Sequence, residues 1–243
     1  MRGLVELDDV HMSFGNVVVA DGLSLSLAPG ETLGVVGPNG AGKTSMLNLI
    51  SGDLRPIRGR ILLDGAEISR LPVHARARLG IGRTYQVPQP FGAMTVFENV
   101  LVGATYSGHG PIDGDPVDVA VDALARTDLL RHANLPAARL PLLDRKRLEL
   151  ARALATKPRV LLLDEIAGGL TEPEVERLVG TIRDVRAAGV AIIWIEHLVS
   201  ALLSVVDRLI ATNLGRILAD GEPRAVMASR EVQSVYLGGE VIV

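Results

Sequence analysis

Cysteine is absent from the 243-residue sequence, which excludes disulfides and cysteine-based metal sites and is consistent with a reducing compartment. Aromatic residues make up only 3% of the chain although hydrophobic residues make up 48%, so the core must be aliphatic. The net charge of −3 gives no electrostatic attraction to nucleic acid or to an anionic membrane surface. The length allows one large domain or two small ones.

Long apolar runs are also missing. The longest, residues 160–163 and 190–195, fall far below the ~20 residues that a membrane-spanning helix needs. Residues 1–9 include three acidic side chains where a signal peptide requires an apolar run. We therefore expect a cytoplasmic chain that reaches a membrane only through a partner protein.

One glycine-rich segment carries the clearest chemical signal. It fits the pattern G-x-x-x-x-G-K-[ST] and reads Gly37, Pro38, Asn39, Gly40, Ala41, Gly42, Lys43, Thr44. A buried strand is predicted before it, and a helix beginning at Ser45 is predicted after it, as in a phosphate-binding P-loop. Glycines let successive N–H groups face one anion, and the helix N-terminus favours negative charge. We predict that residues 37–45 bind ATP, with Lys43 on the β- and γ-phosphates and Thr44 on Mg²⁺.

The first part of the chain is predicted to form strands. Residues 4–36 have strand character, and residues 23–27 alternate between apolar and polar side chains with a period of two. Residues 59–68 are predicted to form a hairpin around an Asp-Gly turn. A strand-rich layer is therefore expected around the P-loop.

The remainder of the chain changes to helices and then to alternating elements. The pattern predicts helices at 72–79, 95–101, 117–130 and 148–155, a strand at 81–86 and a loop at 103–116. Asp144 is the predicted N-cap of the last helix. Strands at 160–164, 190–195, 208–212 and 216–219 alternate with helices at 172–188 and 198–206. This alternation predicts βαβ units on a parallel sheet.

Polar residues follow two of these strands at the edge where α/β sheets bind ligands. Asp164 can bind Mg²⁺ opposite Thr44, and Glu165 can orient or deprotonate the attacking water. Alone, an Asp-Glu pair at a strand end is better explained as a solvated turn, but the upstream P-loop favours catalysis. His197 follows the strand at 190–195, where it can hydrogen-bond the γ-phosphate.

The order of these features resembles the ATP-binding subunit of ABC transporters: the P-loop, Gln86, a helical insertion, Asp164-Glu165 and His197. Residues 147–156, 195–197 and 236–238 look like the ATPases of branched-chain amino acid importers. The resemblance covers nearly the whole chain. It implies an α/β fold, a P-loop NTPase (ABC ATPase) core with a parallel sheet, an N-terminal antiparallel β layer and an inserted helical subdomain. The expected organisation is a single domain, 1–243, with the core at 1–86 and 144–243 and the helical subdomain at 87–143.

The resemblance also implies roles for individual residues. Phe14 matches the aromatic that stacks on adenine, although an ordinary strand aromatic remains the alternative. Gln86 matches the glutamine that contacts Mg²⁺ and water and links the site to the membrane subunits. Residues 168–171 match the loop that meets the partner across the ATPase dimer.

The expected partners follow from the same resemblance. They are transmembrane permease subunits, a second ATPase subunit in a homo- or heterodimer and, indirectly, a solute-binding protein, but no nucleic acid. The segment after Gln86, which includes Pro88, Pro90 and Phe91, is expected to reach the permease. The chain would then lie peripherally on the inner face of the cell membrane.

One segment departs from the family pattern. The family carries a loop close to Leu-Ser-Gly-Gly-Gln, which caps the γ-phosphate bound by the other subunit, where this chain has Leu140-Pro141-Leu142-Leu143-Asp144. Proline lacks a hydroxyl and an N–H, leucine replaces glycine, and aspartate brings negative charge near an anion. Arg145 or Lys146 could compensate in part. Ile166 also replaces the proline usual after the acidic pair.

The expected function is ATP hydrolysis coupled to uptake of branched-chain amino acids or a related small polar solute. Four alternatives stay open at this point. They are an ABC exporter subunit for lipid or lipopolysaccharide, a mainly structural nucleotide-binding subunit, a soluble ABC protein of translation or DNA repair, and a P-loop kinase.

Overall fold

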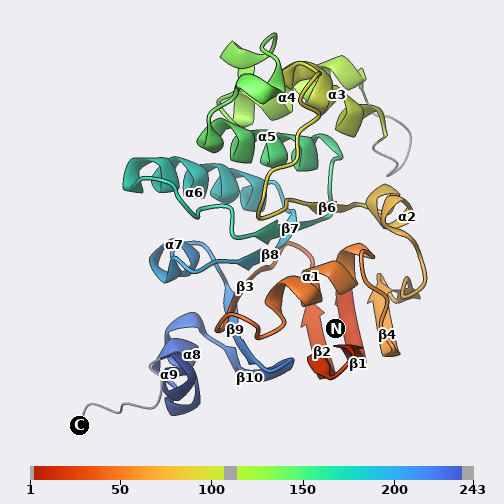
Figure 1. The fold of residues 1–243 in the computed structure, drawn as a ribbon, viewed down its shortest axis with the longest axis vertical. Coiled ribbons are helices and arrows are strands. Elements are labelled where there is room, and N and C mark those ends of the chain that lie inside the picture. The colour runs from red at the N-terminus through yellow and green to blue at the C-terminus, as the bar shows by residue number, and fades with distance from the viewer. Residues whose placement is uncertain (1–2, 107–113, 237–243) are drawn as a thin grey trace. The chain divides into compact units, whose positions relative to one another are not determined.

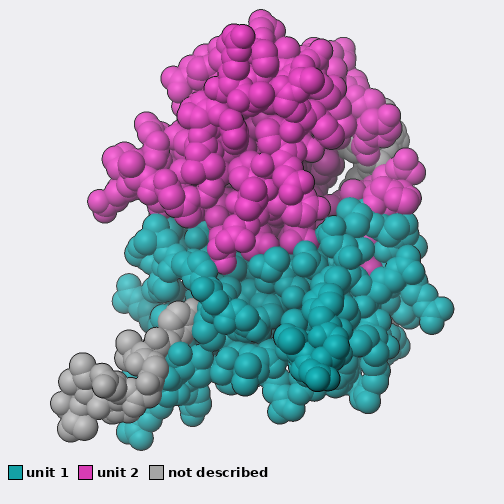
Figure 2. Space-filling model, viewed as in Figure 1, with its two compact units in different colours: residues 1–73, 191–243 teal, residues 74–190 magenta. Residues whose placement is uncertain are grey.

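The computed structural model describes residues 3–106 and 114–236 (Figure 1). The chain forms two compact units, unit 1 with residues 1–73 and 191–243 and unit 2 with residues 74–190 (Figure 2). The predicted helical segment 87–143 falls within unit 2, and its boundaries as a subdomain remain a prediction. The predicted loop 103–116 and the segment 236–238 lie partly outside the described residues.

Unit 1 begins with an antiparallel sheet of order β2-β1-β4-β5. Its strands are β1 (Val5–Phe14), β2 (Val17–Leu27), β4 (Arg58–Leu63) and β5 (Ala66–Glu67). Side chains 23, 25 and 27 of β2 are buried while 24 and 26 are exposed, as the period-two pattern predicts. This sheet confirms the predicted antiparallel layer.

Four further strands of unit 1 run in the order β10-β9-β3-β8. They are β3 (Thr32–Val36), β8 (Ala191–Ile195), β9 (Arg208–Asn213) and β10 (Arg216–Gly221). Strand β3 pairs in parallel with both β8 and β9, which confirms the predicted parallel sheet. Every residue of β3 and β8 is buried, as expected for parallel strands covered on both faces.

The helices of unit 1 include two that the sequence pattern did not predict. The described helices are α1 (Lys43–Ser51), α7 (Val199–Leu203), α8 (Pro223–Ala228) and α9 (Arg230–Tyr236). Helix α7 is shorter than the predicted 198–206, and α8 and α9 follow β10 unpredicted. Glu222 caps α8 by accepting a hydrogen bond from the N–H of Ala225 at 2.7 Å.

Unit 2 contains a parallel strand pair, β6 (Ile81–Arg83) and β7 (Val160–Asp164). Its helices are α3 (Val96–Thr105), α4 (Pro116–Arg126), α5 (Leu142–Ala155) and α6 (Glu172–Ala187), and α2 (Val73–Arg78) begins at its boundary. Short 3₁₀ turns occur at Leu130–His132 and Ala137–Arg139. Helices α3, α4 and α5 enclose one aliphatic cluster that includes the fully buried Val100, Leu124 and Leu148.

Three predicted boundaries in unit 2 were wrong. The strand predicted at 81–86 ends at Arg83. The N–H of Thr84 still donates to the carbonyl oxygen of Leu162, but the side chains of residues 85–87 are exposed. The helix at 117–130 ends at Arg126, because Asp128 takes a left-handed φ of 57°. Asp144 is not the N-cap of α5. That position is Pro141, and Asp144 lies inside the first helical turn.

No helix in residues 3–106 and 114–236 is long and apolar enough to cross a membrane.

Candidate functional site

The P-loop of unit 1 connects the buried strand β3 to helix α1. Gly40 and Gly42 have left-handed φ values of 81° and 95°. A Cβ on Gly42 would collide with the carbonyl oxygen of Val19, and one on Gly37 would collide with that of Thr212. The loop therefore needs glycine both for its backbone path and for the close approach of β2 and β9.

Lys43 begins helix α1 and its ammonium folds back over the loop. The Nζ atom donates to the carbonyl oxygens of Gly37 at 2.8 Å and Pro38 at 3.0 Å, and the residue is buried. Thr44 is exposed and Ser45 is half-buried in the same helical turn. A buried ammonium, an exposed hydroxyl and a helix N-terminus are together suited to an anionic, magnesium-bound ligand.

His197 lies at the same sheet edge of unit 1 as the P-loop. Val35 of β3 pairs with Ile195 of β8 in a parallel register. Gly37 and His197, each two residues further along the chain, therefore leave the sheet side by side. His197 is exposed there, and its backbone N–H donates to the carboxylate of the buried Glu196 at 3.2 Å.

Phe14 occupies the exposed end of the β1–β2 hairpin. Its side chain is 51% exposed and the residue pairs with Val17 of β2. The same hairpin approaches the P-loop at Val19, where the carbonyl oxygen faces Gly42. Phe14 is therefore available for stacking on a planar ligand, and its assignment to adenine remains a prediction.

The acidic pair of unit 2 is placed at the end of strand β7. Asp164 is 1% exposed, whereas Glu165 is half-buried and takes a left-handed φ of 49°. The amide Nε2 of Gln86 donates to the carboxylate Oε2 of Glu165 at 2.5 Å. Gln86 and Glu165 are 79 residues apart in sequence, so the fold has brought these two predicted residues together.

Arg83 is a charged residue of this region that the sequence analysis missed. Its Nη2 lies 3.4 Å from the carboxylate of Asp164, and both side chains are almost fully buried. The Arg83 guanidinium also lies over the ring of Tyr85, 4.7 Å from its centre. The available signal was an arginine inside a predicted sheet strand, because a buried arginine normally requires a partner.

The segment after Gln86 is attached to helix α5. The N–H of Gln89 donates to the Glu149 carboxylate at 2.9 Å, while Arg152 donates to the Gln89 carbonyl at 3.0 Å and pairs with Glu149. Arg152 also lies over the ring of Phe91, 4.8 Å from its centre. Val87 and Phe91 are nevertheless 66% and 46% exposed. An exposed apolar segment is thus held to a buried helix by charged contacts.

The first turn of α5, where the family pattern is broken, is closed by its own side chains. The Asp144 carboxylate is buried, and it lies 3.2 Å from Nη1 of Arg147 and 3.6 Å from Nε2 of His132. Arg145 donates to the carbonyl oxygen of Leu140 at 2.8 Å, and Lys146 donates to that of Gly168. Both cations that could have compensated for the altered loop are therefore directed at backbone carbonyls.

Each unit thus assembles part of the predicted set. Unit 1 holds residues 37–45, Phe14 and His197, and unit 2 holds Gln86, Asp164 and Glu165. A glycine cradle with a buried lysine is suited to the phosphates of a nucleotide, and P-loop ATPases pair such a loop with an acidic strand end.

The chain belongs to the ABC transporter family, whose family model matches residues 20–168. It is accordingly an α/β P-loop ATPase of the ABC type, which binds ATP and hydrolyses it to drive transport. The predicted family, fold class and enzyme class are therefore confirmed, and the P-loop kinase alternative is removed.

Two curated relatives cover almost the whole chain. The high-affinity branched-chain amino acid transport ATP-binding protein LivG of Escherichia coli is 35% identical over 97% of this chain and 98% of its own length. The lipopolysaccharide export system ATP-binding protein LptB of Acidithiobacillus ferridurans is 34% identical over 99% of each. A solved ATP-binding cassette of an ABC transporter in its ADP conformation is 28% identical and superposes with a TM-score of 0.87 over 98% of this chain and all of its own.

Proposed function

We propose that this chain is the ATP-hydrolysing subunit of an importer for branched-chain amino acids or a related small polar solute. The observation that carries the proposal is the end-to-end similarity to LivG, which is 35% identical over 97% of this chain and 98% of its own length. ATP hydrolysis would provide the free energy that drives the solute across the membrane.

The residues of unit 1 would bind the nucleotide. The P-loop amides and the Lys43 ammonium would neutralise the phosphates, and Lys43 would exchange its two loop carbonyls for phosphate oxygens. Thr44 would bind Mg²⁺ through its hydroxyl, His197 would donate to the γ-phosphate, and Phe14 would stack on the adenine ring.

The residues of unit 2 would carry out the proton transfer. Glu165 would accept a proton from the attacking water, and the Gln86 amide would hold the carboxylate in position. Asp164 would provide a second oxygen ligand for Mg²⁺, since Thr44 and Asp164 both offer the hard oxygen donors that this ion prefers. When bound, Mg²⁺ would neutralise charge on the transferred phosphoryl group.

The exposed segment 87–91 would meet the transmembrane permease subunits. Its apolar side chains are available for a partner, and Glu149 and Arg152 connect it to α5. Movement of the permease would therefore be transmitted to α5 and, through Gln86, to Glu165. Through this contact the chain would lie peripherally on the inner face of the membrane, paired with a second ATPase and served by a solute-binding protein.

Export of lipopolysaccharide is the second candidate, because LptB matches 99% of this chain at 34% identity. The two functions differ in what they move and in its direction, and both use the same ATPase chemistry.

A transport assay separates them. The transporter that copurifies with this chain is reconstituted in proteoliposomes, and ATP-dependent accumulation of labelled leucine, isoleucine and valine is measured. We expect accumulation that is lost with Lys43→Ala, together with loss of ATP binding by the isolated variant in calorimetry. Extraction of lipopolysaccharide without amino acid uptake would favour the second candidate. Equal ATP affinity of wild type and Lys43→Ala would refute the assignment of the P-loop.

A further inference from the structure

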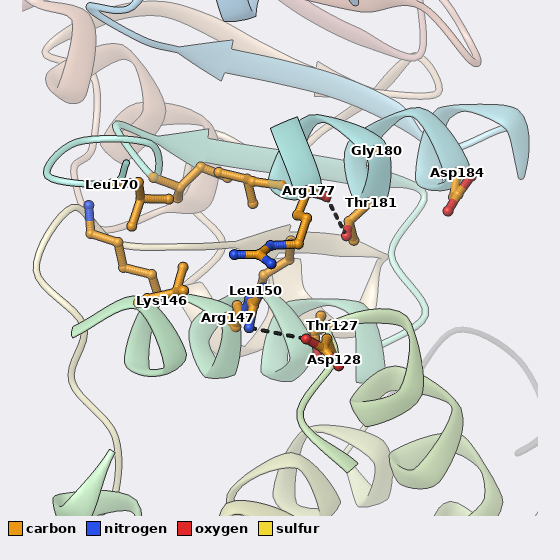
Figure 3. Close-up of a pocket in the computed structure, with 13 residues that line it drawn as sticks. Thr127, Asp128, Lys146, Arg147, Leu150, Leu170, Arg177, Gly180, Thr181 and Asp184 are labelled. Atoms are coloured by element: carbon orange, nitrogen blue, oxygen red, sulfur yellow. Dashed lines mark hydrogen bonds and ion pairs between the residues drawn. The ribbon is translucent and has the colours of Figure 1, made fainter. Parts of the chain in front are cut away.

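A pocket of about 290 Å³ lies wholly within unit 2, apart from the residues assigned above to ATP hydrolysis (Figure 3). Helices α5 and α6 form two of its walls, the turn after α4 forms a third, and the loop that follows Glu165 closes it. Five of its lining residues are branched aliphatics: Leu143, Leu150, Ile166, Leu170 and Leu178. The pocket therefore has an apolar floor that matches a small branched hydrocarbon.

Two guanidinium groups stand over this floor from opposite helices. Arg177 extends from α6 towards α5, where Arg147 lies (Figure 3). Arg147 is 8% exposed, and both of its ion pairs, with Asp144 at 3.2 Å and Asp128 at 3.4 Å, use Nη1. Arg177 is exposed and forms no ion pair with any residue that the structure describes. A planar anion between the two arginines would meet several N–H donors in a fixed geometry.

Two acidic groups also line the pocket. Asp184 stands two helical turns after Arg177 on α6, and Asp128 belongs to the turn after α4 (Figure 3). Lys146 also lines the pocket, but its ammonium donates to the Gly168 carbonyl. Three basic and two acidic side chains line the pocket, and Asp144, which pairs with Arg147, offsets the third positive charge. Arg177, which forms no ion pair among the described residues, is therefore the cation that a carboxylate would meet.

From this arrangement we propose that the pocket binds a small carboxylate with a branched aliphatic chain, held by Arg147 and Arg177 with its hydrocarbon on the apolar floor. A branched-chain α-amino acid and its α-keto acid share this chemistry. The amino acid would place its ammonium towards Asp184, whereas the keto acid would not use that residue.

Occupancy of this pocket would bear on hydrolysis through the chain itself. Ile166 directly follows Glu165, and Ile166 and Leu170 both line the pocket. A bound ligand would therefore restrain residues 166–170 and with them the backbone that positions Glu165. The ATPase would then sense the level of a branched-chain carboxylate at a site separate from its own nucleotide, in a pocket lined by Leu143 and Leu170 of the two segments that the resemblance assigns to contacts with the partner ATPase.

The test is calorimetric titration of the full chain with leucine and with α-ketoisocaproate. Acetate, which lacks the branched chain, and isoamylamine, which lacks the carboxylate, serve as control ligands. We expect saturable binding of at least one branched carboxylate, weakened roughly tenfold or more by Arg177→Gln, because a hydrogen bond to a charged group is lost. Arg183→Gln is the matched control, since this exposed arginine of α6 does not line the pocket.

Further measurements identify the ligand and locate the site. Asp184→Asn should weaken leucine and leave α-ketoisocaproate unchanged if the amino acid is the ligand. Hydrogen exchange should show protection of residues 166–170 on binding. Absence of saturable binding by either ligand, equal effects of Arg177→Gln and Arg183→Gln, or acetate binding as tightly as the branched acids would overturn the proposal. Its failure is distinguishable from failure of the proposed transport function, because ATP binding and its loss with Lys43→Ala are measured separately.

Discussion

Replacement of Glu165 by glutamine isolates the proton transfer from the other steps of hydrolysis. The amide has nearly the same size as the carboxylate, and its oxygen can still accept the hydrogen bond that Gln86 now donates at 2.5 Å. The side chain should therefore keep its place while losing its basicity. General-base assistance contributes roughly 10²- to 10⁴-fold in rate. At about 1.36 kcal/mol per factor of ten, this loss raises the barrier by about 2.7–5.4 kcal/mol.

A single-turnover assay measures this loss directly. The chain, assembled in its transporter, is held in excess over labelled ATP, and phosphate release is followed after mixing with Mg²⁺. We expect a rate lowered by the stated factor with ATP affinity unchanged. Glu172→Gln is the matched control, because Glu172 is exposed in the first turn of α6 and its removal should leave the rate unchanged.

A double variant tests whether Gln86 acts through Glu165. Gln86→Ala removes a hydrogen bond to a charged group, which costs about 1.5–3 kcal/mol and should slow hydrolysis roughly 10- to 150-fold. Once the base is gone that contact has nothing to position, so Gln86→Ala with Glu165→Gln should be little slower than Glu165→Gln alone. Additive losses would show that Gln86 acts elsewhere. An unchanged rate in Glu165→Gln would refute the assignment of the base and direct attention to His197.

Three further predictions follow from individual contacts. Gly42→Ala should abolish ATP binding in calorimetry, because the added methyl group would collide with the Val19 carbonyl oxygen and because residue 42 has a left-handed φ of 95°. ATP binding equal to that of the wild type would show that the loop can relax. The Thr95 backbone N–H lowers the pKa of the Glu98 carboxyl below its ordinary value of 4.5. The resulting stability is present above pH 4.5 and is lost as the pH falls, so urea unfolding should show Glu98→Gln less stable at pH 7 and the difference shrinking below pH 4.5. In a heterodimer with a second ATPase that has an intact signature loop, Glu165→Gln in this chain should remove most of the ATPase activity. The matching change in the partner should remove little of it. Equal losses from the two variants would mean that residues 140–144 still cap phosphate.

The parts of the fold that sequence could predict are those set by local pattern. The P-loop motif specifies its own glycines and charges, and the period of two in β2 follows from one buried face. The parallel strands were predictable because buried strands alternated with helices. The helix over residues 172–188 was predictable as well, since Thr171 and Glu174 form a capping box at its start.

The parts that sequence could not predict depend on contacts between distant segments. The hydrogen bond from Gln86 to Glu165 joins residues 79 apart, and the ion pair of Arg83 with Asp164 joins residues 81 apart. Neither distance nor partner is encoded in a local pattern. Asp144 was assigned as an N-cap because aspartate favours that position. It lies instead three residues after the N-cap Pro141, in the first turn of α5, where ion pairs with Arg147 and His132 stabilise it. Tertiary contacts here override the local preference.

The contacts of the first turn of α5 explain in physical terms why residues 140–144 differ from the signature loop of the family. A carboxylate in the first turn of a helix is stabilised by the helix dipole, and Asp144 takes this place with Arg147 as its partner. We therefore expect this helix start, which already holds a carboxylate, to bind a phosphate poorly. Arg145 and Lys146 reinforce this state by holding the chain before the helix and the loop at Gly168.

The same contacts explain why the change need not harm the chain's own P-loop chemistry. Pro141 as N-cap contributes no side-chain hydrogen bond to α5, and Asp144 with its partners provides the charge that stabilises the helix start instead. The altered loop is therefore compatible with a well-formed helix that still supports Gln89 through Glu149 and Arg152. We therefore expect this chain to bind and hydrolyse its own ATP while offering a poor phosphate cap to its partner. On this expectation, the working unit would contain two different ATPase subunits rather than a pair of identical ones.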